Sequence, residues 1–511
     1  VHALYQHLWH ERVSIEQQQQ WHLRVGERKE TAYGSRASEI ATELAVHFEQ
    51  GRDYRRAIHY LQQAGENALR RSANREAITH LTRGLELLQP LPDTPERTRQ
   101  ELGLRVALTA PLTATKGLAA AEVGATHNRA RELCQQVGET PELFPVLCGL
   151  YAFYGARGEL ETARTLVEQL LRLAQRAQDP ALLLQAHLAL GAAMFHRGEF
   201  IPARGHLEQV ILYGPQQYHS QAFHYGLDPE VFCRSYAAWV LWYLGYPEQA
   251  LQNSQEALTL AQELAHPTSL GLALNVTAFL HQYRREELLT QSRAEAAMTL
   301  ATEHGMAQVL AVGTIVRGWA RAIQGQGEEG ILQIRHGLAA FEVMGAELGQ
   351  PYNLALLAEA YGKGGQNEEG LSILAEALAR VDRTGERTYE AELWRLYGEL
   401  SLRSGEPESG RIGDAKNEAE NRRKGFSFAD SPFRRFSVSS PEEAFHKAIE
   451  IAKHQQAKSF ELRAVMSLAR LWQRQGKQHE ARTTLLEIYN WFTEGFDTKD
   501  LQEAKTLLDS L

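Results

Sequence analysis

The side chains in this sequence that are best suited to chemistry are three histidines near its start, His2, His7 and His10. His7 and His10 lie in the run HLWHE, which has the residue types of a zinc-binding protease helix. Such helices have the order H-E-x-x-H or H-x-x-E-H, so that the ligands converge on one ion. The order here is H-x-x-H-E, which fits neither pattern, and we therefore expect no metal site.

Other catalytic patterns are absent from the sequence. It contains no G-x-x-x-x-G-K-[ST] loop for nucleotide phosphates, no nucleophile elbow around a serine and no Cys-His signature. Its acidic residues are scattered over predicted helices, where they are ordinarily solvated. We therefore expect that this chain is not an enzyme and requires no cofactor.

Aromatic side chains form the stronger candidate site. They recur on the first helices of predicted helical hairpins, at positions that face the hollow side of such an array. We predict a groove for a ligand or partner formed by Phe195, His196, Phe232, Trp239, Trp242, Tyr243, Asn275, Phe279, Tyr283 and Trp319. An open aromatic surface would suit a sugar, a peptide, an aromatic ligand or an apolar side chain of a protein. The alternative is that these residues pack between stacked helices.

Charged residues take the same positions in the later hairpins. We predict a secondary groove formed by Glu359, Lys363, Arg395, Glu399 and Arg403. The inner surface is therefore expected to be aromatic in its middle and charged towards its end. If the aromatic residues form core, the charged set becomes the next candidate.

A repeated helical hairpin must position both sets. The residue that ends each first helix recurs as Gly158, Gly198, Gly245, Arg285, Gly325, Gly365, Gly405 and Gly476, and the successive differences in residue number are 40, 47, 40, 40, 40, 40 and 71. The small residue of the second helix follows five positions later, as Ala163, Ala203, Ala250, Gly330, Gly370 and Ala481, with Thr290 in one deviant repeat. A fixed period of roughly 20 to 50 residues is typical of a solenoid, whose units bury their apolar faces against each other. We predict an all-α, right-handed α-solenoid of tetratricopeptide-like hairpins, whose period is the recurring difference of 40.

The two longer separations indicate insertions, and composition sets the remaining boundaries. We predict a helical remnant of a preceding domain or an N-terminal cap over residues 1–36, opening repeats over 37–90 and the main array over 99–405. Residues 406–440 are polar and rich in serine, so we expect a disordered insertion within one repeat. Residues 441–511 complete the last repeats and a C-terminal cap helix.

Composition excludes several classes of function. The chain has 54 basic and 63 acidic residues, so no global positive field favours nucleic acid. No apolar run approaches the roughly 18 residues of a membrane-spanning helix. Three cysteines, Cys134, Cys148 and Cys233, are too few for a disulfide framework, which favours a reducing compartment. We expect a cytoplasmic protein that binds neither membrane nor nucleic acid.

Three stretches near the start carry a resemblance to a known family. The runs VHALYQHLWHERV, WHLRVGERKETAYG and ATELAVHFEQGRDYRRAIHYLQQAGENALRRSANREAITHLTRGLELL resemble the junction in bacterial STAND-class signalling ATPases where a winged-helix domain meets tetratricopeptide-like repeats. The end of the chain, from AIEIAKHQQAK onwards, is similar to the C-terminus of the adenylate-cyclase-associated subgroup. The resemblance implies an upstream nucleotide-binding module, which this chain lacks. We therefore expect a fragment of a longer protein.

Two functions remain open. The first is a regulatory sensor arm of a STAND-type protein, which binds a small inducer or a protein in its groove and biases an upstream NTPase switch. The second is a freestanding adaptor of the tetratricopeptide type that binds proteins. A phosphate loop upstream of Val1 would favour the sensor, and a start methionine close to Val1 would favour the adaptor.

Overall fold

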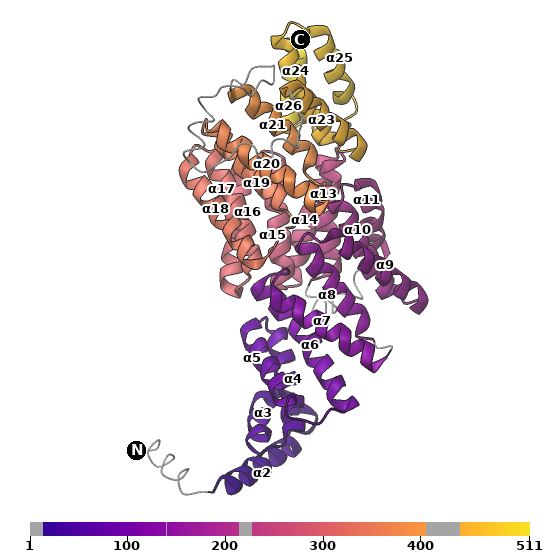
Figure 1. Cartoon of the computed structure of the whole chain (residues 1–511), viewed down its shortest axis with the longest axis vertical. Helices are drawn as coiled ribbons and strands as arrows, with labels where there is room; N and C mark the ends of the chain where they lie inside the picture. Colours follow the sequence, from indigo (N-terminus) through magenta and orange to yellow (C-terminus); the bar gives the residue numbers. More distant parts are fainter. Residues whose placement is uncertain (1–13, 139–140, 214–226, 405–439) are drawn as a thin grey trace, which may run out of the picture. The chain divides into compact units, whose positions relative to one another are not determined.

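The computed structural model describes residues 14–138, 141–213, 227–404 and 440–511, and every regular element in these ranges is helical (Figure 1). The all-α prediction is therefore confirmed. The described residues fall into two compact units, one up to residue 150 and the other from residue 151. None of the described helices is both long and apolar enough to cross a bilayer.

The first unit consists of short helical hairpins. Its elements are α2 (Ile15–Tyr33), a 3₁₀ helix (Gly34–Ile40), α3 (Ala41–Gln50), α4 (Tyr54–Arg70), α5 (Asn74–Leu88), α6 (Pro95–Lys116) and α7 (Ala121–Val137). The Asp53 carboxylate accepts a hydrogen bond from the backbone N–H of Arg56 and so begins α4. Leu44, Phe48 and Ala57 are buried at the α3–α4 contact, as the hairpin pattern predicts. Helix α8 (Leu143–Ala156) crosses the boundary between the units.

The second unit contains the main array. Its further helices are α9 (Leu160–Ala177), α10 (Pro180–His196), α11 (Phe200–Tyr213), α13 (Pro229–Tyr243), α14 (Pro247–Glu263), α15 (Pro267–Tyr283), α16 (Glu287–His304), α17 (Ala307–Ile323), α18 (Gly327–Met344), α19 (Gln350–Lys363), α20 (Asn367–Thr384), α21 (Glu390–Ser404), α23 (Pro441–Gln455), α24 (Lys458–Arg474), α25 (Gln478–Tyr489) and α26 (Lys499–Ser510). Consecutive helices pack against each other throughout this series.

The turn residues confirm the predicted register of the repeat. Each described turn glycine has a positive φ, from 74° at Gly158 to 99° at Gly325, as a left-handed turn between two helices requires. Arg285 takes this conformation too, with φ 61°, although it has a side chain. The small position of the second helix is buried in all seven repeats for which the sequence pattern names it, including Thr290 and Ala481.

The predicted insertion over residues 406–440 lies outside the described residues, except for Ser440. The helices on either side of it, α21 and α23, pack against each other as one hairpin. A Cβ atom on Gly398 of α21 would lie 2.6 Å from the Phe445 ring of α23, so the two helices approach closely. The helical faces of this repeat therefore meet across the insertion. The other predicted boundaries stay predictions.

The array of the second unit returns to its own beginning. The backbone N–H of Glu347 donates to the carbonyl of Ala156 over 2.8 Å, and that of Arg387 donates to the carbonyl of His196 over 2.9 Å. Further along, the Ser459 hydroxyl donates to the carbonyl of Trp242. The turns of early hairpins are thus hydrogen-bonded to segments several repeats later in the chain, and rings of later helices pack against α13 and α15.

Candidate functional site

The aromatic set is mostly buried. Trp319 and Tyr243 are each 1% exposed, and five further members are also buried, namely Phe195, Trp239, Trp242, Asn275 and Tyr283. His196, Phe232 and Phe279 are partly buried. The prediction that this surface is open to solvent is therefore wrong for seven of its ten members. Whether any of the ten contacts a ligand stays a prediction.

Later segments of the chain fill the aromatic surface. Phe460 of α24 packs edge-on against Tyr243, with ring centroids 4.9 Å apart, and Tyr352 of α19 packs edge-on against Tyr283 at 5.7 Å. Within the cluster, Trp242 stacks on Tyr283 at 4.7 Å. Phe460 and Tyr352 belong to helices that come later in the chain and pack back against the early repeats. The aromatic side chains therefore pack against other parts of the same protein and are not open to solvent.

Two positions of the repeat run along the inner surface from the aromatic to the charged set. The first, six residues before the turn, is occupied by Trp239, Phe279, Trp319, Glu359, Glu399 and Arg470. The second, two residues before the turn, is occupied by Tyr243, Tyr283, Ile323, Lys363, Arg403 and Arg474. We call these the inner positions. Aromatic side chains hold them in α13 and α15, and charged ones in α19, α21 and α24.

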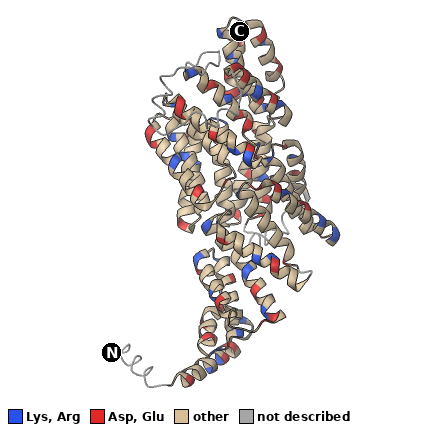
Figure 2. Ribbon diagram, in the orientation of Figure 1, with Lys and Arg blue, Asp and Glu red and all other residues tan. Residues whose placement is uncertain are grey.

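The charged inner positions line a cavity of about 520 Å³. All five residues of the predicted secondary groove contribute to it, and Trp319 contributes from the aromatic set. The remaining walls come from α24, from α26 and from the turn between α15 and α16. We call this space the charged cavity. In Figure 2 both signs of charge are interspersed along the helices.

A buried arginine organises the floor of the charged cavity. Arg463 is 8% exposed, and its guanidinium group donates to the Asp500 carboxylate over 2.7 Å, to Glu392 over 3.3 Å and to the carbonyl of Tyr283. It therefore ties together α24, α26, α21 and α15. Burial alone would lower the pKa of Arg463, but Asp500 and Glu392 raise it, so the side chain stays charged.

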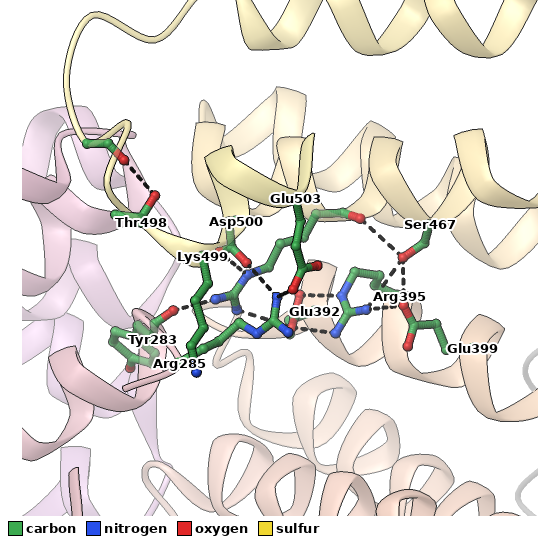
Figure 3. A network of polar contacts seen from close by, with 12 residues as sticks. Tyr283, Arg285, Glu392, Arg395, Glu399, Ser467, Thr498, Lys499, Asp500 and Glu503 are labelled. Carbon is green, nitrogen blue, oxygen red and sulfur yellow. Dashed lines mark hydrogen bonds and ion pairs between the residues drawn. The ribbon is translucent and has the colours of Figure 1, made fainter. Parts of the chain in front are cut away.

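A second arginine bridges two carboxylates beside it (Figure 3). Arg395 donates to both oxygens of Glu392 over 2.8 and 2.9 Å and to Glu399 over 2.6 Å. The Ser467 hydroxyl of α24 also donates to Glu399, over 2.8 Å. Burial would raise the pKa of Glu399, but Arg395 and Ser467 outweigh it, so the pKa is lowered and the carboxylate is ionised.

The C-terminal helix α26 closes one wall (Figure 3). Arg285 forms ion pairs with Asp500 over 3.2 Å and with Glu503 over 2.9 Å. Lys499 pairs with Glu287 over 2.8 Å. Arg285 occupies the turn position that is glycine in the other repeats, and its side chain reaches α26.

The mouth of the cavity is basic. Lys363, Arg403 and Arg474 occupy the second inner position on three successive first helices, and all three are exposed. Arg403 pairs with Glu399 over 3.3 Å. Lys363 and Arg474 form no ion pair with any residue in the described ranges. The mouth can therefore accept acidic groups.

Sequence reasoning missed the residues that α24 contributes. Arg463, Arg470 and Arg474 precede Gly476 by the same offsets at which Glu392, Glu399 and Arg403 precede Gly405. Counting back from Gly476 would have found them. The predicted groove stopped at Arg403 because the insertion interrupts the period there.

Metal chemistry finds no support in the described part of the chain, where no three His, Cys, Asp or Glu side chains are grouped to hold an ion. The histidines at positions 2, 7 and 10 lie outside the described residues.

The fold defines the class of protein. It is an all-α, tetratricopeptide-like repeat protein, similar in structure to a Rap protein solved in complex with Competence and Sporulation Factor. The TM-score is 0.51 at 12% sequence identity, over 80% of this chain and 99% of the Rap chain. Aspartyl phosphate phosphatase F from Bacillus subtilis gives a TM-score of 0.39 at 13% sequence identity, over 79% of this chain and 95% of that chain.

Sequence comparison finds a relative of unknown activity. No family model matches the chain. "Uncharacterized protein R02095" of Rhizobium meliloti (strain 1021) is 24% identical over 410 residues, which is 79% of this chain and 40% of the relative. The chain thus spans about 40% of the length of the curated relative that it matches. These comparisons give no support to the STAND resemblance.

Proposed function

We propose that the chain is a regulatory binding arm that takes up an extended peptide in the charged cavity, either a free peptide or a segment of a protein partner. One observation carries the proposal. Inner positions of α17, α19, α21 and α24 converge on one space of about 520 Å³, which is within the usual range for ligand pockets. The role is binding and not catalysis.

The chemistry of the cavity suits a peptide. Its floor offers the Glu359 carboxylate and its mouth offers the cations of Lys363 and Arg474, so both charged ends and both types of charged side chain find partners. Backbone amides can hydrogen-bond to the same groups. The chain is similar in fold to a Rap protein that was crystallised with Competence and Sporulation Factor, and this similarity supports a binding role for the repeats of this chain.

A finer proposal is that binding controls an upstream NTPase module, as the resemblance to STAND-class proteins implies. Coupling of this kind requires that the ligand binds the two states of the switch with different affinities. The alternative is a freestanding adaptor. The full open reading frame separates the two, because only the sensor requires a phosphate loop upstream.

Binding to a pentapeptide library tests the proposal directly. We expect members of a positional-scanning library to bind the purified chain, and Lys363→Glu to weaken this binding by about tenfold, which is about 1.4 kcal/mol. The matched control is Lys505→Glu, which makes the same charge change on α26 at an exposed lysine outside the cavity. Both variants should fold normally, because exposed substitutions usually change stability by less than about 0.5 kcal/mol.

Two results would contradict the proposal. One is that no library member binds the wild-type chain. The other is that Lys363→Glu and Lys505→Glu weaken binding equally, since the effect would then come from net charge and not from the cavity.

A further inference from the structure

One carboxyl group of the charged cavity lacks a cationic partner among the described residues. Glu359 lies on α19 at the first inner position and lines the cavity. The Trp319 indole Nε1–H donates to its Oε2 over 2.6 Å. No ion pair connects Glu359 to another side chain in the described ranges, and Lys363, one helical turn later, does not reach it.

The neighbouring arginines already form ion pairs with other carboxylates. Arg395 bonds to Glu392 and Glu399, and Arg463 bonds to Asp500 and Glu392. Both act on Glu359 only through space, and burial outweighs them, so the pKa of Glu359 is raised. Glu399, at the same position one repeat later, accepts hydrogen bonds from two arginines and a serine. At equivalent positions of successive repeats, the Glu399 carboxylate therefore has cationic partners and the Glu359 carboxylate has none among the described residues.

Glu359 is partly buried, and withdrawing a carboxylate from water without a counter-ion is costly, so a cation that enters the site removes this cost. Guanidinium groups suit the role because they bind carboxylates through two parallel hydrogen bonds, and ammonium groups bind as point charges. The Trp319 N–H fixes one oxygen of Glu359, so the carboxylate is held in place before a ligand arrives. This arrangement favours a cationic ligand group at the floor.

We propose that Glu359 binds a guanidinium or ammonium group of the ligand at the floor of the charged cavity. This inference rests on the proposed function and specifies its ligand as a peptide with a cationic group. The basic mouth takes the acidic groups of the same ligand. Trp319 is a positioning residue, since its hydrogen bond orients the carboxylate.

Small probes test the site without a known ligand. L-argininamide and L-citrullinamide differ in their guanidinium and neutral ureido groups, and L-lysinamide and L-norleucinamide form a second pair. Binding is followed in the full chain through the ¹⁹F resonance of 5-fluorotryptophan at Trp319. All four probes share the α-amino group, so each pair isolates the side chain, and we expect the argininamide or lysinamide affinity to exceed that of the partner with the neutral side chain by about tenfold. The pair that shows the larger preference identifies the cationic group.

The variants assign the preference to one residue. Glu359→Gln keeps an oxygen that accepts the Trp319 hydrogen bond but removes the charge, so the preference should vanish. Glu368→Gln on α20 is the matched control, because Glu368 is exposed and outside the cavity, and it should keep the preference. Equal affinities within both pairs, no saturable shift with either cation, or a preference that survives Glu359→Gln would each overturn the inference.

The two proposals can fail separately. If peptides bind in a Lys363-dependent manner but the cationic probes show no preference, the cation site is wrong and the peptide cavity stands. If the cationic probes bind through Glu359 but no library peptide binds, the site stands and the peptide proposal is wrong.

Discussion

The inner positions of α13 and α15 carry aromatic rings, of which three are buried and Phe279 is partly buried, whereas the same positions of α19, α21 and α24 carry charges around a cavity. Their place in the repeat is identical, so the hairpin itself does not determine the difference. The two regions differ in which later segments of the chain pack over them. Segments around Arg387 and Ser459 return over the first region, whereas α26 and the turn between α15 and α16 border a cavity in the second. The inner surface of a solenoid is therefore a groove only where the array does not fold back onto it.

The largest expected effect comes from a matched pair at the second inner position. Tyr243→Ala removes a ring that stacks on Phe200 and meets Phe460 edge-on, and should lower the free energy of unfolding by about 3 to 5 kcal/mol. Lys363→Ala removes an exposed side chain and should change it by less than about 0.5 kcal/mol. Urea denaturation followed by circular dichroism measures both.

Equal stability of the two variants would contradict the proposed difference between the aromatic region and the charged cavity. A neutral Tyr243→Ala would mean that the aromatic region is open, and the groove predicted from the sequence would again be the leading site. A large loss in Lys363→Ala would instead mean that the charged positions are structural.

The buried ion network should give the next effect. Arg463→Met leaves Asp500 and Glu392 without their shared cation, and removing one member of a buried pair typically costs about 3 kcal/mol or more. Arg474→Met, at the exposed end of the same helix, is the control and should be nearly neutral. Thermal unfolding of the two variants compares them directly. Similar melting temperatures would show that the network does not hold α26 in place.

Much of the fold could be predicted from the sequence because it follows local rules. Gly325 and Gly365 end helices through a left-handed conformation, and Ala203 and Ala481 are small where helices meet. The turn glycine and the small residue both act within a single hairpin, so they recur at a fixed period that is visible in the sequence. The five charged residues of the predicted secondary groove followed from the same period, since their positions are defined relative to the turn.

The burial of the aromatic set could not be predicted in this way. Phe460 covers Tyr243 from a helix several repeats later in the chain, and no periodic pattern states which distant segment returns to which hairpin. The role of Arg285 was missed for a related reason. The period of the repeat marks it only as a turn residue, whereas its side chain pairs with α26. Contacts between distant turns of the array decide both features.

The smallest effect compares two glutamates at the first inner position. The pKa of Glu359 is raised in the folded chain, chiefly by burial, so its contribution to stability is present below its ordinary value of 4.5 and is lost as pH rises through the folded pKa. The pKa of Glu399 is lowered, because Arg395 and Ser467 outweigh burial, so its contribution is present above 4.5 and is lost only as pH falls through the folded pKa. The two contributions have opposite signs.

Replacement by glutamine should therefore act in opposite directions. Glu359→Gln keeps the Trp319 hydrogen bond and relieves the buried charge, so we expect it to increase the free energy of unfolding at pH 8 by about 1 kcal/mol, with the gain shrinking towards pH 4. Glu399→Gln should decrease it at both pH 6 and pH 8, because its carboxylate is ionised and paired throughout this range. Urea denaturation at several pH values measures both. A loss of stability in Glu359→Gln at pH 8 would mean that its carboxylate already has an internal cation, and the cavity would then have no vacant partner for a cationic ligand.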